Sequence, residues 1–523
     1  MRQRPMLFAT ALLCAAVTMV GCEYSANPPA PSVAPTVTQA PDAKLQRFYD
    51  QDVKWQSCAK ESLVVRMSAP LANPKYSCAV LNVPLDYDDP EEKSITLQLA
   101  RTGPVKSTKP LLFFNPGGPG GGSVASLDYM ATSVFSPEVL DHYDLVAMDP
   151  RGVGLSSPVR CFTPEQTDKF RASGLLKSVA DVEAQAKAMG SLCLERSEGL
   201  AKNIDTDSVV KDFDIARAVF GLEKLDYAGF SYGTFIGALY ADTFPDRVGR
   251  FVLDGAMDPS SSITDIAKGQ AAGFEAVVEH WLGEVLSGSD AQRLPLSSDV
   301  ATAKMQLRQW LDGLETNPLP TSDPDRPLTR GLAASALYGL MYSPQTYQYA
   351  TTGLIQAMSA EDGSFLLQMA DAYANRLVDG SYEDNSFEAF MVINALDYEP
   401  VGDPTQWEAT ARELEEKYPL VGSDFTFSEA GIAGWPVESK KVRRPVTGAG
   451  AGPILVVGTT HDPATPYSWA QALAQQLQSA TLLTSEGWSH CAYSSAAEDS
   501  CVRDAVDDYL LDGAVPEEGL VCQ

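Results

Sequence analysis

The stretch LDYAGFSYGTFIGALYADTF, residues 225–244, carries the pattern that decides the fold. It begins with apolar residues that fit a short buried strand, passes through the G-x-S-x-G motif of residues 229–233 and ends in a segment of helical character. A turn of this kind lifts the serine hydroxyl above the edge of a sheet, and its glycines let the backbones approach closely. The context predicts Ser231 as a nucleophile rather than a serine in an ordinary glycine turn.

Short apolar runs alternate with amphipathic segments on both sides of this stretch. The runs PLLFFN (110–115), DLVAMD (144–149) and RFVLDGA (250–256) fit strands, and helix-like segments lie between them. The alternation stops after Asp254 and resumes with PILVVGT at residue 453, and the residues between have mostly helical periodicity. The sequence therefore predicts an α/β fold with a mainly parallel sheet, split by a large, mostly helical cap.

The N-terminal segment MRQRPMLFATALLCAAVTMVGC fits a secretory signal, because two arginines precede an apolar run too short to span a bilayer. Its end, MVGC, resembles a bacterial lipoprotein box, although Met19 stands where leucine is usual. We expect lipid attachment at Cys22; a plain cleaved signal is the alternative. The predicted divisions are a signal peptide (1–22), a Pro/Ala-rich tether (23–45), a first core part (46–255), the cap (256–445) and a C-terminal core part (446–523).

The charge balance argues against nucleic acid as a partner. The chain has 39 basic and 68 acidic residues and a formal charge of −29, so a phosphate backbone would be repelled. The four histidines show no paired i, i+4 spacing and the cysteines are scattered. We therefore expect no metal and no other cofactor.

The cysteines of an exported chain can oxidise to disulfides. Of the nine cysteines, Cys14 leaves with the signal and Cys22 is taken by the lipid, so seven remain and one stays unpaired. Each short loop closed by a disulfide contributes about 3 kcal/mol in the chain-entropy model. Proximity along the chain suggests the pairs Cys58–Cys78, Cys161–Cys193 and Cys501–Cys522, with Cys491 left over.

A serine nucleophile needs a base, and three of the four histidines are poor candidates. His142 precedes a strand, whereas catalytic groups gather where parallel strands end. His280 lies inside the predicted cap. His461 directly precedes Asp462, and neighbours in an extended segment project to opposite sides, so these two residues cannot form the hydrogen-bonded base and carboxylate.

The remaining histidine completes a catalytic triad. His490 follows the last predicted strand, and Asp462 follows the strand before it, so the chain order is Ser, Asp, His, as in α/β-hydrolases. We assign Ser231 as nucleophile, His490 as base and Asp462 as the carboxylate that orients the base.

Two backbone amides are candidates for an oxyanion hole. NPGGPGGGS (115–123) follows the strand PLLFF, and its glycines allow N–H groups to approach a substrate; a merely flexible glycine loop is the alternative. We assign the N–H groups of Gly118 and Tyr232, the residue after the nucleophile. Arg151, in DPRGVGLSS (149–157), has the expected structural role of ordering this loop through hydrogen bonds to neighbouring carbonyls.

The segments NPGGPG, DPRGVG, GFSYGT, VLDGAMDP, THDPATP and GWSH together resemble the actinobacterial secreted tripeptidyl aminopeptidases and the related mycobacterial cell-envelope serine hydrolases, the carboxylesterase A group among them. The resemblance runs from Trp55 to Cys522. It implies an exported serine exopeptidase that removes short peptides, typically tripeptides, from free N termini, with Ser231, Asp462 and His490 in the roles given above. It also implies that the cap limits access to Ser231.

The cap departs from the family at Ala395 and Ile432, where many relatives have cysteines, which suggests that a bridge is missing. An aminopeptidase must also recognise a cationic terminus, for which a desolvated carboxylate in the cap is suited. Asp397, close to the altered position, is the candidate for the substrate amine. An ordinary solvated or helix-capping aspartate is the alternative, and Glu275, Glu279 and Glu399 compete for the role.

Two other functions remain open from the sequence. The same triad serves a carboxylesterase or lipase that acts on envelope esters, and the membrane anchor favours that function. A catalytically inactive lipoprotein that binds peptides is the second, against which the intact triad argues. We expect peptides with a free N terminus as substrates, contact with the membrane through the N-terminal lipid only, and an extracytoplasmic location, either anchored to the cell envelope or secreted.

Overall fold

The structure, a computed structural model, describes residues 40–58, 76–197, 199–289, 292–495 and 499–523. The predicted signal peptide, Cys22 and most of the predicted tether lie outside these residues. Within them, no helix has both the length and the apolar character that crossing a membrane requires.

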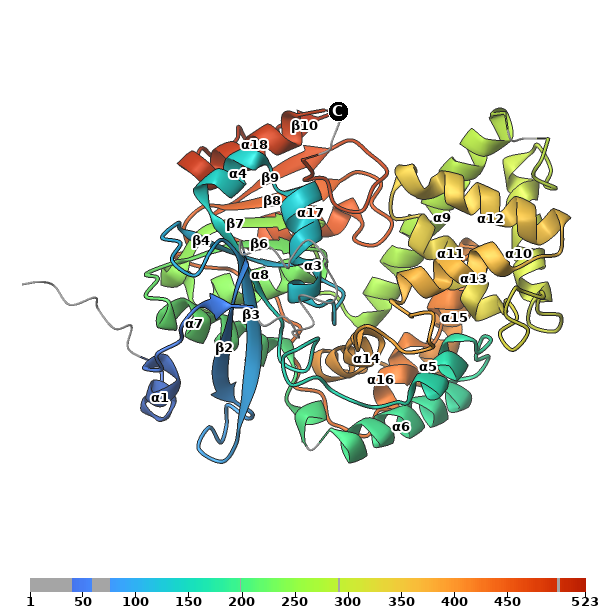
Figure 1. Ribbon diagram of the computed structural model, residues 1–523. Helices are drawn as coiled ribbons and strands as arrows, with labels where there is room; N and C mark the ends of the chain where they lie inside the picture. The colour runs from blue at the N-terminus through green and yellow to red at the C-terminus, as the bar shows by residue number, and fades with distance from the viewer. Residues whose placement is uncertain (1–39, 59–75, 198, 290–291, 496–498) are drawn as a thin grey trace, which may run out of the picture. The chain divides into compact units, whose positions relative to one another are not determined.

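A single mixed sheet forms the core (Figure 1). Its strand order is β1-β2-β3-β5-β4-β6-β7-β8-β9-β10; β1, β2 and β3 pair antiparallel, β3 meets β5 antiparallel, and the strands from β5 onward are parallel. The predicted α/β fold with a mainly parallel sheet is confirmed. The bounds are β1 Gln56–Ser57, β2 Tyr76–Pro84, β3 Ser94–Thr102, β4 Leu111–Asn115, β5 Asp144–Met148, β6 Leu225–Phe230, β7 Val248–Asp254, β8 Ile454–Thr459, β9 Ala480–Ser485 and β10 Val521–Cys522.

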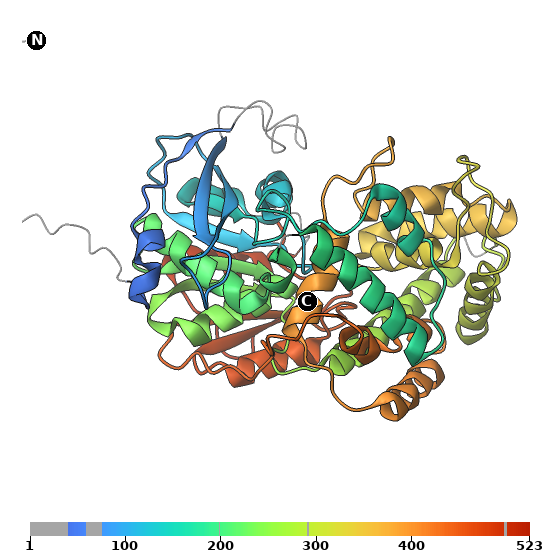
Figure 2. The ribbon, with the colours of Figure 1, turned by 90° about the horizontal axis from the view of Figure 1, so that it is seen from below.

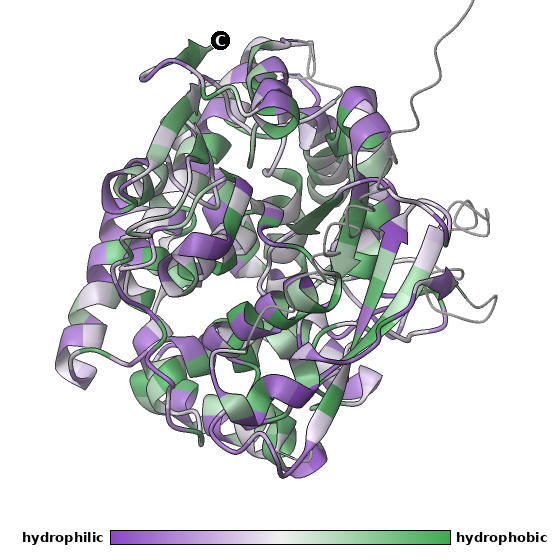
Figure 3. Cartoon of the chain, turned by 90° about the vertical axis from the view of Figure 1, so that its left-hand side faces the viewer, coloured by the Kyte–Doolittle hydropathy of each residue, from purple (hydrophilic) through white to green (hydrophobic). Residues whose placement is uncertain are grey.

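Helices cover both faces of the sheet, which explains why its central strands are apolar at almost every position. Phe113 packs on one face, and its neighbours Leu112 and Phe114 pack on the other, because side chains alternate along a strand. In Figure 3 the strands carry green, hydrophobic segments, whereas the surrounding helices mix green and purple. One face packs against α7 (Thr206–Val219), α8 (Tyr232–Thr243) and α17 (Tyr467–Gln476), and the other against α3 (Ser123–Tyr129), α4 (Pro137–His142) and α18 (Cys501–Asp512).

Between β7 and β8 the chain forms the cap. Its outer helices, grouped together in Figure 1, bury a separate hydrophobic cluster that includes Trp281, Leu337 and Leu354. By contrast, Val392 and Trp435 belong to the cluster of the core. The cap helices are α9 Ile263–Ser287, α10 Val300–Gly313, α11 Arg330–Leu340, α12 Tyr347–Ser359, α13 Ser364–Tyr373, α14 Ser386–Asp397, α15 Pro404–Lys417 and α16 Ser428–Ala433.

Two further helices join the cap from an earlier part of the chain. These are α5 (Pro164–Arg171) and α6 (Val179–Arg196), and α6 packs along α16 (Figures 1 and 2). Arg171 reaches Asp371 in α13, and Asp168 pairs with Arg376. The predicted cap of residues 256–445 therefore omits helices that precede β6, because these pairings join residues about 200 positions apart and leave no local pattern.

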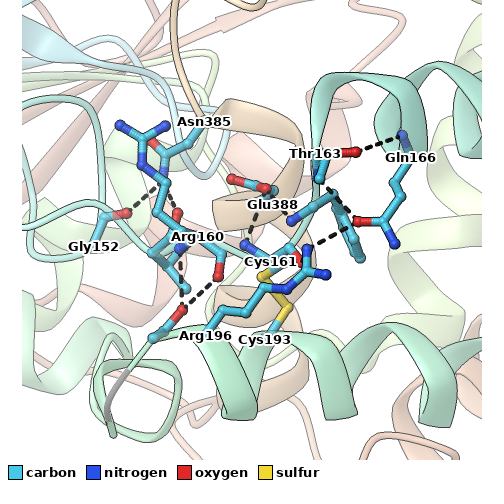
Figure 4. Close-up of a disulfide and its surroundings, with 12 residues drawn as sticks. Gly152, Arg160, Cys161, Thr163, Gln166, Cys193, Arg196, Asn385 and Glu388 are labelled. Atoms are coloured by element: carbon cyan, nitrogen blue, oxygen red, sulfur yellow. Dashed lines mark hydrogen bonds between the residues drawn. A yellow bond between two sulfur atoms is a disulfide. The ribbon is translucent and has the colours of Figure 1, made fainter.

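Hydrogen bonds join a short segment before α5 to the start of α14 (Figure 4). The Asn385 side chain donates to the carbonyls of Gly152 and Val159 at 2.8 and 2.9 Å, and its oxygen accepts from the N–H of Gly154. Glu388 accepts from the N–H groups of Cys161 and Phe162 at 3.0 and 2.7 Å. Figure 4 shows that the disulfide of Cys161 lies directly beside this contact. Core and cap are thus joined by buried hydrogen bonds as well as by apolar packing.

The three disulfides of the structure are the pairs suggested by proximity: Cys58–Cys78, Cys161–Cys193 and Cys501–Cys522. Of the cysteines that the structure describes, Cys491 is the one outside a disulfide. Burial raises the pKa of its thiol to about 11, which keeps the thiol protonated at neutral pH. Three disulfides are typical of a protein that folds outside the cytoplasm.

The predicted role of Arg151 in ordering the glycine loop is wrong. Arg151 is fully buried and forms a two-pronged ion pair with Asp212 on α7, with both N–O distances at 2.7 Å. Its other N–H groups donate to the carbonyls of Pro84, Leu85 and Asn203. The guanidinium therefore joins the end of β2 to α7, as its fork geometry allows, and the carbonyls that it reaches lie in other segments than the glycine loop.

Replacing Arg151 with methionine should lower the free energy of unfolding by about 3–5 kcal/mol, because Asp212 would stay buried without its partner. Denaturant unfolding monitored by circular dichroism measures the change. Lys268→Ala, which breaks the exposed pair with Glu413, is the matched control and should cost less than about 1 kcal/mol. Adding Asp212→Leu to Arg151→Met should restore much of the loss; equal losses in Arg151→Met and Lys268→Ala would contradict this role.

Candidate active site

Ser231 occupies a sharp turn between β6, which ends at Phe230, and α8, which begins at Tyr232. Its φ of 54° and ψ of −124° are rarely adopted by residues other than glycine. The turn is held by the serine N–H, which donates to the carbonyl of Asp254 at 2.9 Å. A Cβ on Gly229 would lie 2.4 Å from the carbonyl oxygen of Gly233, so the motif needs a glycine there. The local structure is the strand, turn and helix that the sequence predicts.

His490 and Asp462 meet at the carboxyl ends of the neighbouring strands β8 and β9. The His490 Nδ1 lies 2.9 Å from each carboxylate oxygen of Asp462. Asp462 is buried and also accepts from the N–H groups of Ala464, Thr465 and Cys491, which fix its orientation. Burial lowers the pKa of His490, but the charge and hydrogen bond of Asp462 outweigh it and raise the pKa well above the usual value.

The other histidines lie away from this pair. His461 is exposed, whereas Asp462 is buried, and it stacks on Trp488 with ring centroids 3.9 Å apart. His280, from α9, stacks on the other face of the same indole at 3.8 Å. His142 lies against Tyr143 at the end of α4. The tryptophan between two imidazoles ties the cap to the loops of the core.

The glycine loop after β4 lies directly against the turn of Ser231. A Cβ on Gly117 would come within 2.6 Å of the Phe230 carbonyl oxygen and 3.0 Å of the Tyr232 nitrogen. Asn115 orders the loop by accepting from the N–H of Gly117 at 3.0 Å. At its far end Asp149 accepts from the N–H groups of Val124 and Leu155, and burial raises the pKa of this carboxyl to about 6. Asn115 and Asp149 thus have the ordering role predicted for Arg151.

Two cavities meet at Ser231, and Gly118 borders both. The larger, here called the cleft, has a volume of about 1160 Å³ and is also bordered by His490. The smaller, here called the chamber, has a volume of about 440 Å³ and is bordered by Tyr232. Charged side chains on the cleft are Arg160, Arg171, Glu383, Asp384 and Glu388. The chamber is lined mainly by apolar side chains, among them Met189, Met257, Ile266, Met391, Ile432 and Trp435.

Comparison with known proteins identifies the family. Residues 418–522 match the model of the TAP-like protein family, and residues 110–313 match that of the alpha/beta hydrolase fold. Carboxylesterase B of Mycobacterium tuberculosis is 34% identical over 531 residues, which cover 100% of this chain and 99% of the relative. The chain belongs to the TAP-like α/β-hydrolases.

Two other relatives of this TAP-like hydrolase have names that refer to peptide cleavage. Serine protease Hip1 of Mycobacterium tuberculosis is 32% identical over 540 residues, covering 99% of this chain and 98% of the relative. Tripeptidyl aminopeptidase of Streptomyces coelicolor is 29% identical over 484 residues, covering 90% of this chain and 86% of the relative. The chain is therefore a hydrolase of the α/β-hydrolase fold, and the disulfides together with these relatives indicate an extracytoplasmic protein.

The structure contradicts the prediction that Asp397 of this TAP-like hydrolase meets the substrate amine. Asp397 ends α14 and is fully buried, which raises the pKa of its carboxyl to about 7. Its oxygens accept from the N–H and hydroxyl of Thr206 at 2.9 and 2.5 Å and from the Tyr232 hydroxyl at 3.1 Å. Asp397 instead anchors the side chain of the residue that follows the nucleophile.

The competing carboxylates are also occupied elsewhere. Glu275 and Glu279 both pair with Lys304 at 2.9 Å, and Glu399 pairs with Lys441 at 2.6 Å. The carboxylate that does line the chamber, among the described residues, is Asp424, which sequence reasoning missed. It lies in a short helical turn whose sequence, GSDF, carries no signal that one of its residues lines a cavity.

Proposed function

We propose that this TAP-like hydrolase is a serine exopeptidase that releases short peptides, typically tripeptides, from free N termini. The observation that carries the proposal is the arrangement at the cleft. Ser231 and His490 both line the cleft, and Asp462 lies within hydrogen-bonding distance of Nδ1 of the imidazole. Two relatives whose names refer to peptide cleavage support the peptidase assignment.

The arrangement suits acyl transfer. The hydroxyl oxygen of Ser231 attacks the carbonyl carbon, its proton passes to Nε2 of His490, and Asp462 keeps Nδ1–H directed away from the reaction. The N–H groups of Gly118 and Tyr232 stabilise the oxyanion. His490 then gives the proton to the leaving amine as the C–N bond breaks. A water molecule releases the peptide from Ser231 by the same proton route.

The position of His490 gives the substrate a direction. A general acid must lie beside the leaving group, and His490 borders the cleft. The leaving part therefore extends into the cleft, and the acyl part, which carries the free N terminus, extends into the chamber. Because cap residues from α9, α14 and α16 line the chamber, it holds a short peptide only.

Asp424 is the carboxylate that we assign to the substrate amine. It lines the chamber, and its side chain is held by Arg330 at 2.6 and 2.9 Å and by the Tyr338 hydroxyl at 2.8 Å. Carboxylate oxygens accept more than one hydrogen bond, so an ammonium group can still bind. Arg330 also has Asp312 and Glu315 within 3.4 and 3.9 Å, so it keeps partners if Asp424 is neutralised.

A tripeptide anilide with a free N terminus should be cleaved at least about tenfold faster, by kcat/KM, than its acetylated form, because a hydrogen bond to a charged group contributes about 1.5–3 kcal/mol. Asp424→Asn should raise KM for the free peptide about 10- to 100-fold and leave the acetylated one unchanged. The release of aniline at neutral pH measures both.

Equal cleavage of the free and the acetylated peptide by the unmodified enzyme would overturn the proposal that it is an exopeptidase. Free-amine selectivity that survives in Asp424→Asn would overturn only the role of Asp424. A short-chain ester belongs in the same experiment, because the apolar chamber and the relative named carboxylesterase B favour a carboxylesterase as the second candidate. Turnover of the ester alone would make that candidate the function.

The remaining parts of the proposal concern location and partners. We propose that peptides with free N termini are the partners of the site and that a lipid on Cys22 anchors the protein to the cell envelope. Cys22 lies outside the described residues. A non-catalytic peptide-binding lipoprotein would not need the buried Asp462 beside His490, so this function is the least supported.

A further inference from the structure

The chamber beside Ser231 has a lining that suits a particular kind of substrate. Four helices contribute apolar side chains to its walls: Met189 on α6, Ile266 on α9, Met391 on α14 and Ile432 on α16. Methionine side chains adapt to irregular apolar shapes, so these walls can close around groups that differ in outline. The volume of about 440 Å³ lies in the range of ordinary ligand sites.

We propose that the chamber selects substrates whose acyl part carries a bulky apolar group next to the scissile bond, such as a large aliphatic or aromatic side chain. The inference rests on the proposed function for the direction of the substrate, which places the acyl part in the chamber. Its chemical basis is the removal of apolar surface from water, which favours larger groups until the chamber is filled. Each methylene buried there should raise kcat/KM about fourfold.

Ile432 is the residue of the lining that sets the size of this group. It is only partly buried, so its side chain can be exchanged with little disturbance of the core. It belongs to α16, which contacts α14, and both Ile432 and Ala395 of α14 line the chamber. Both residues have apolar side chains, so the space that this wall leaves in the chamber depends on the size of those side chains.

The test uses esters with one leaving group, p-nitrophenol, and unbranched acyl chains from acetyl to decanoyl. For the unmodified protein, kcat/KM should rise with chain length and then fall. Ile432→Phe should move the maximum to a shorter chain and lower the rate on the long esters about 10- to 100-fold, with little change for acetate. Ile432→Ala should move the maximum to a longer chain. If the two substitutions of Ile432 shift the preferred chain length in opposite directions, a general loss of folding cannot be the cause.

The matched control is Ala374→Phe, at a position that lines the cleft. It should leave the preference for acyl length unchanged and alter the preference for the leaving group, measured with acetyl esters of alcohols of increasing size. A flat acyl series in the unmodified protein, or an acyl preference that moves with Ala374→Phe and stays fixed with the Ile432 variants, overturns the proposal. These esters contain no amine. Failure to cleave free-amine peptides would therefore overturn the exopeptidase proposal, and the ester series would still test the acyl preference of the chamber.

Discussion

Replacing Ser231 with alanine should lower kcat/KM by about 10⁴-fold or more on the tripeptide anilide and on the short ester. Alanine removes the oxygen that forms the acyl-enzyme, and the oxyanion hole alone supplies only a small part of the acceleration. The loss should be the same for both substrates, because both reactions pass through the same bond to the serine. His490→Ala should lose as much, since the triad acts as a unit.

The experiment measures hydrolysis and labelling by a fluorophosphonate in parallel. Ser335→Ala is the matched control, because this serine lines the same cleft away from the turn of Ser231. It should keep labelling and turnover. If Ser231→Ala still takes up the probe, another residue is the nucleophile, and the triad proposed here is wrong. Circular dichroism of each variant confirms that the sheet is intact.

Replacing Asp462 with asparagine should lower kcat by about 10⁴-fold, although the side chain keeps its size. Asp462 accepts Nδ1–H of His490 and stabilises the imidazolium that forms during reaction. Asparagine has one acceptor instead of two and presents N–H donors. The histidine then carries its proton on Nε2 instead of Nδ1, so Nε2 cannot accept the proton of Ser231. The loss should be in kcat rather than in KM, because Asp462 is buried behind the histidine.

The pH profile separates this role from a merely structural one. The base must be neutral to accept the serine proton, so activity rises with pH as His490 loses its proton. Because Asp462 raises the pKa of His490, this rise should lie above the pH of an ordinary histidine. In Asp462→Asn the residual rise should move to lower pH. A profile that stays in place while kcat falls would contradict the electrostatic role of Asp462.

The residues that could be predicted from sequence share one property: a short local sequence pattern indicates their function. Ser231 stands in a motif with its strand and helix on either side, and Cys161 and Cys193 pair across a short loop. The main chemistry and the fold class followed from such local patterns. Within such a pattern the local backbone places the side chain, and a distant contact, such as that of the Ser231 N–H with the Asp254 carbonyl, only adds support.

The parts that could not be predicted depend on contacts between distant segments. Arg151 is predicted from sequence to order the glycine loop, but its buried partner is Asp212 on α7. Asp397 has the burial expected of a desolvated carboxylate, yet its oxygens face Thr206 and Tyr232. Asp424 lines the chamber, and its carboxylate is held by Arg330 and Tyr338. In each case the direction of one side chain depends on a residue dozens to hundreds of positions away.

The hydrogen bond between Asp397 and Tyr232 bears on how new specificities arise in this family. The carboxylate sits at the end of a cap helix, and the tyrosine follows the nucleophile, so the lid and the catalytic turn share one buried polar network. The cap is therefore not an exchangeable module. A cap grafted from a relative would have to bring an equivalent of Asp397 in register with Thr206, or else the buried hydroxyls of Thr206 and Tyr232 would both lose the carboxylate that accepts their hydrogen bonds. Divergence of substrate preference is thus easier through the walls of the chamber than through replacement of the whole lid.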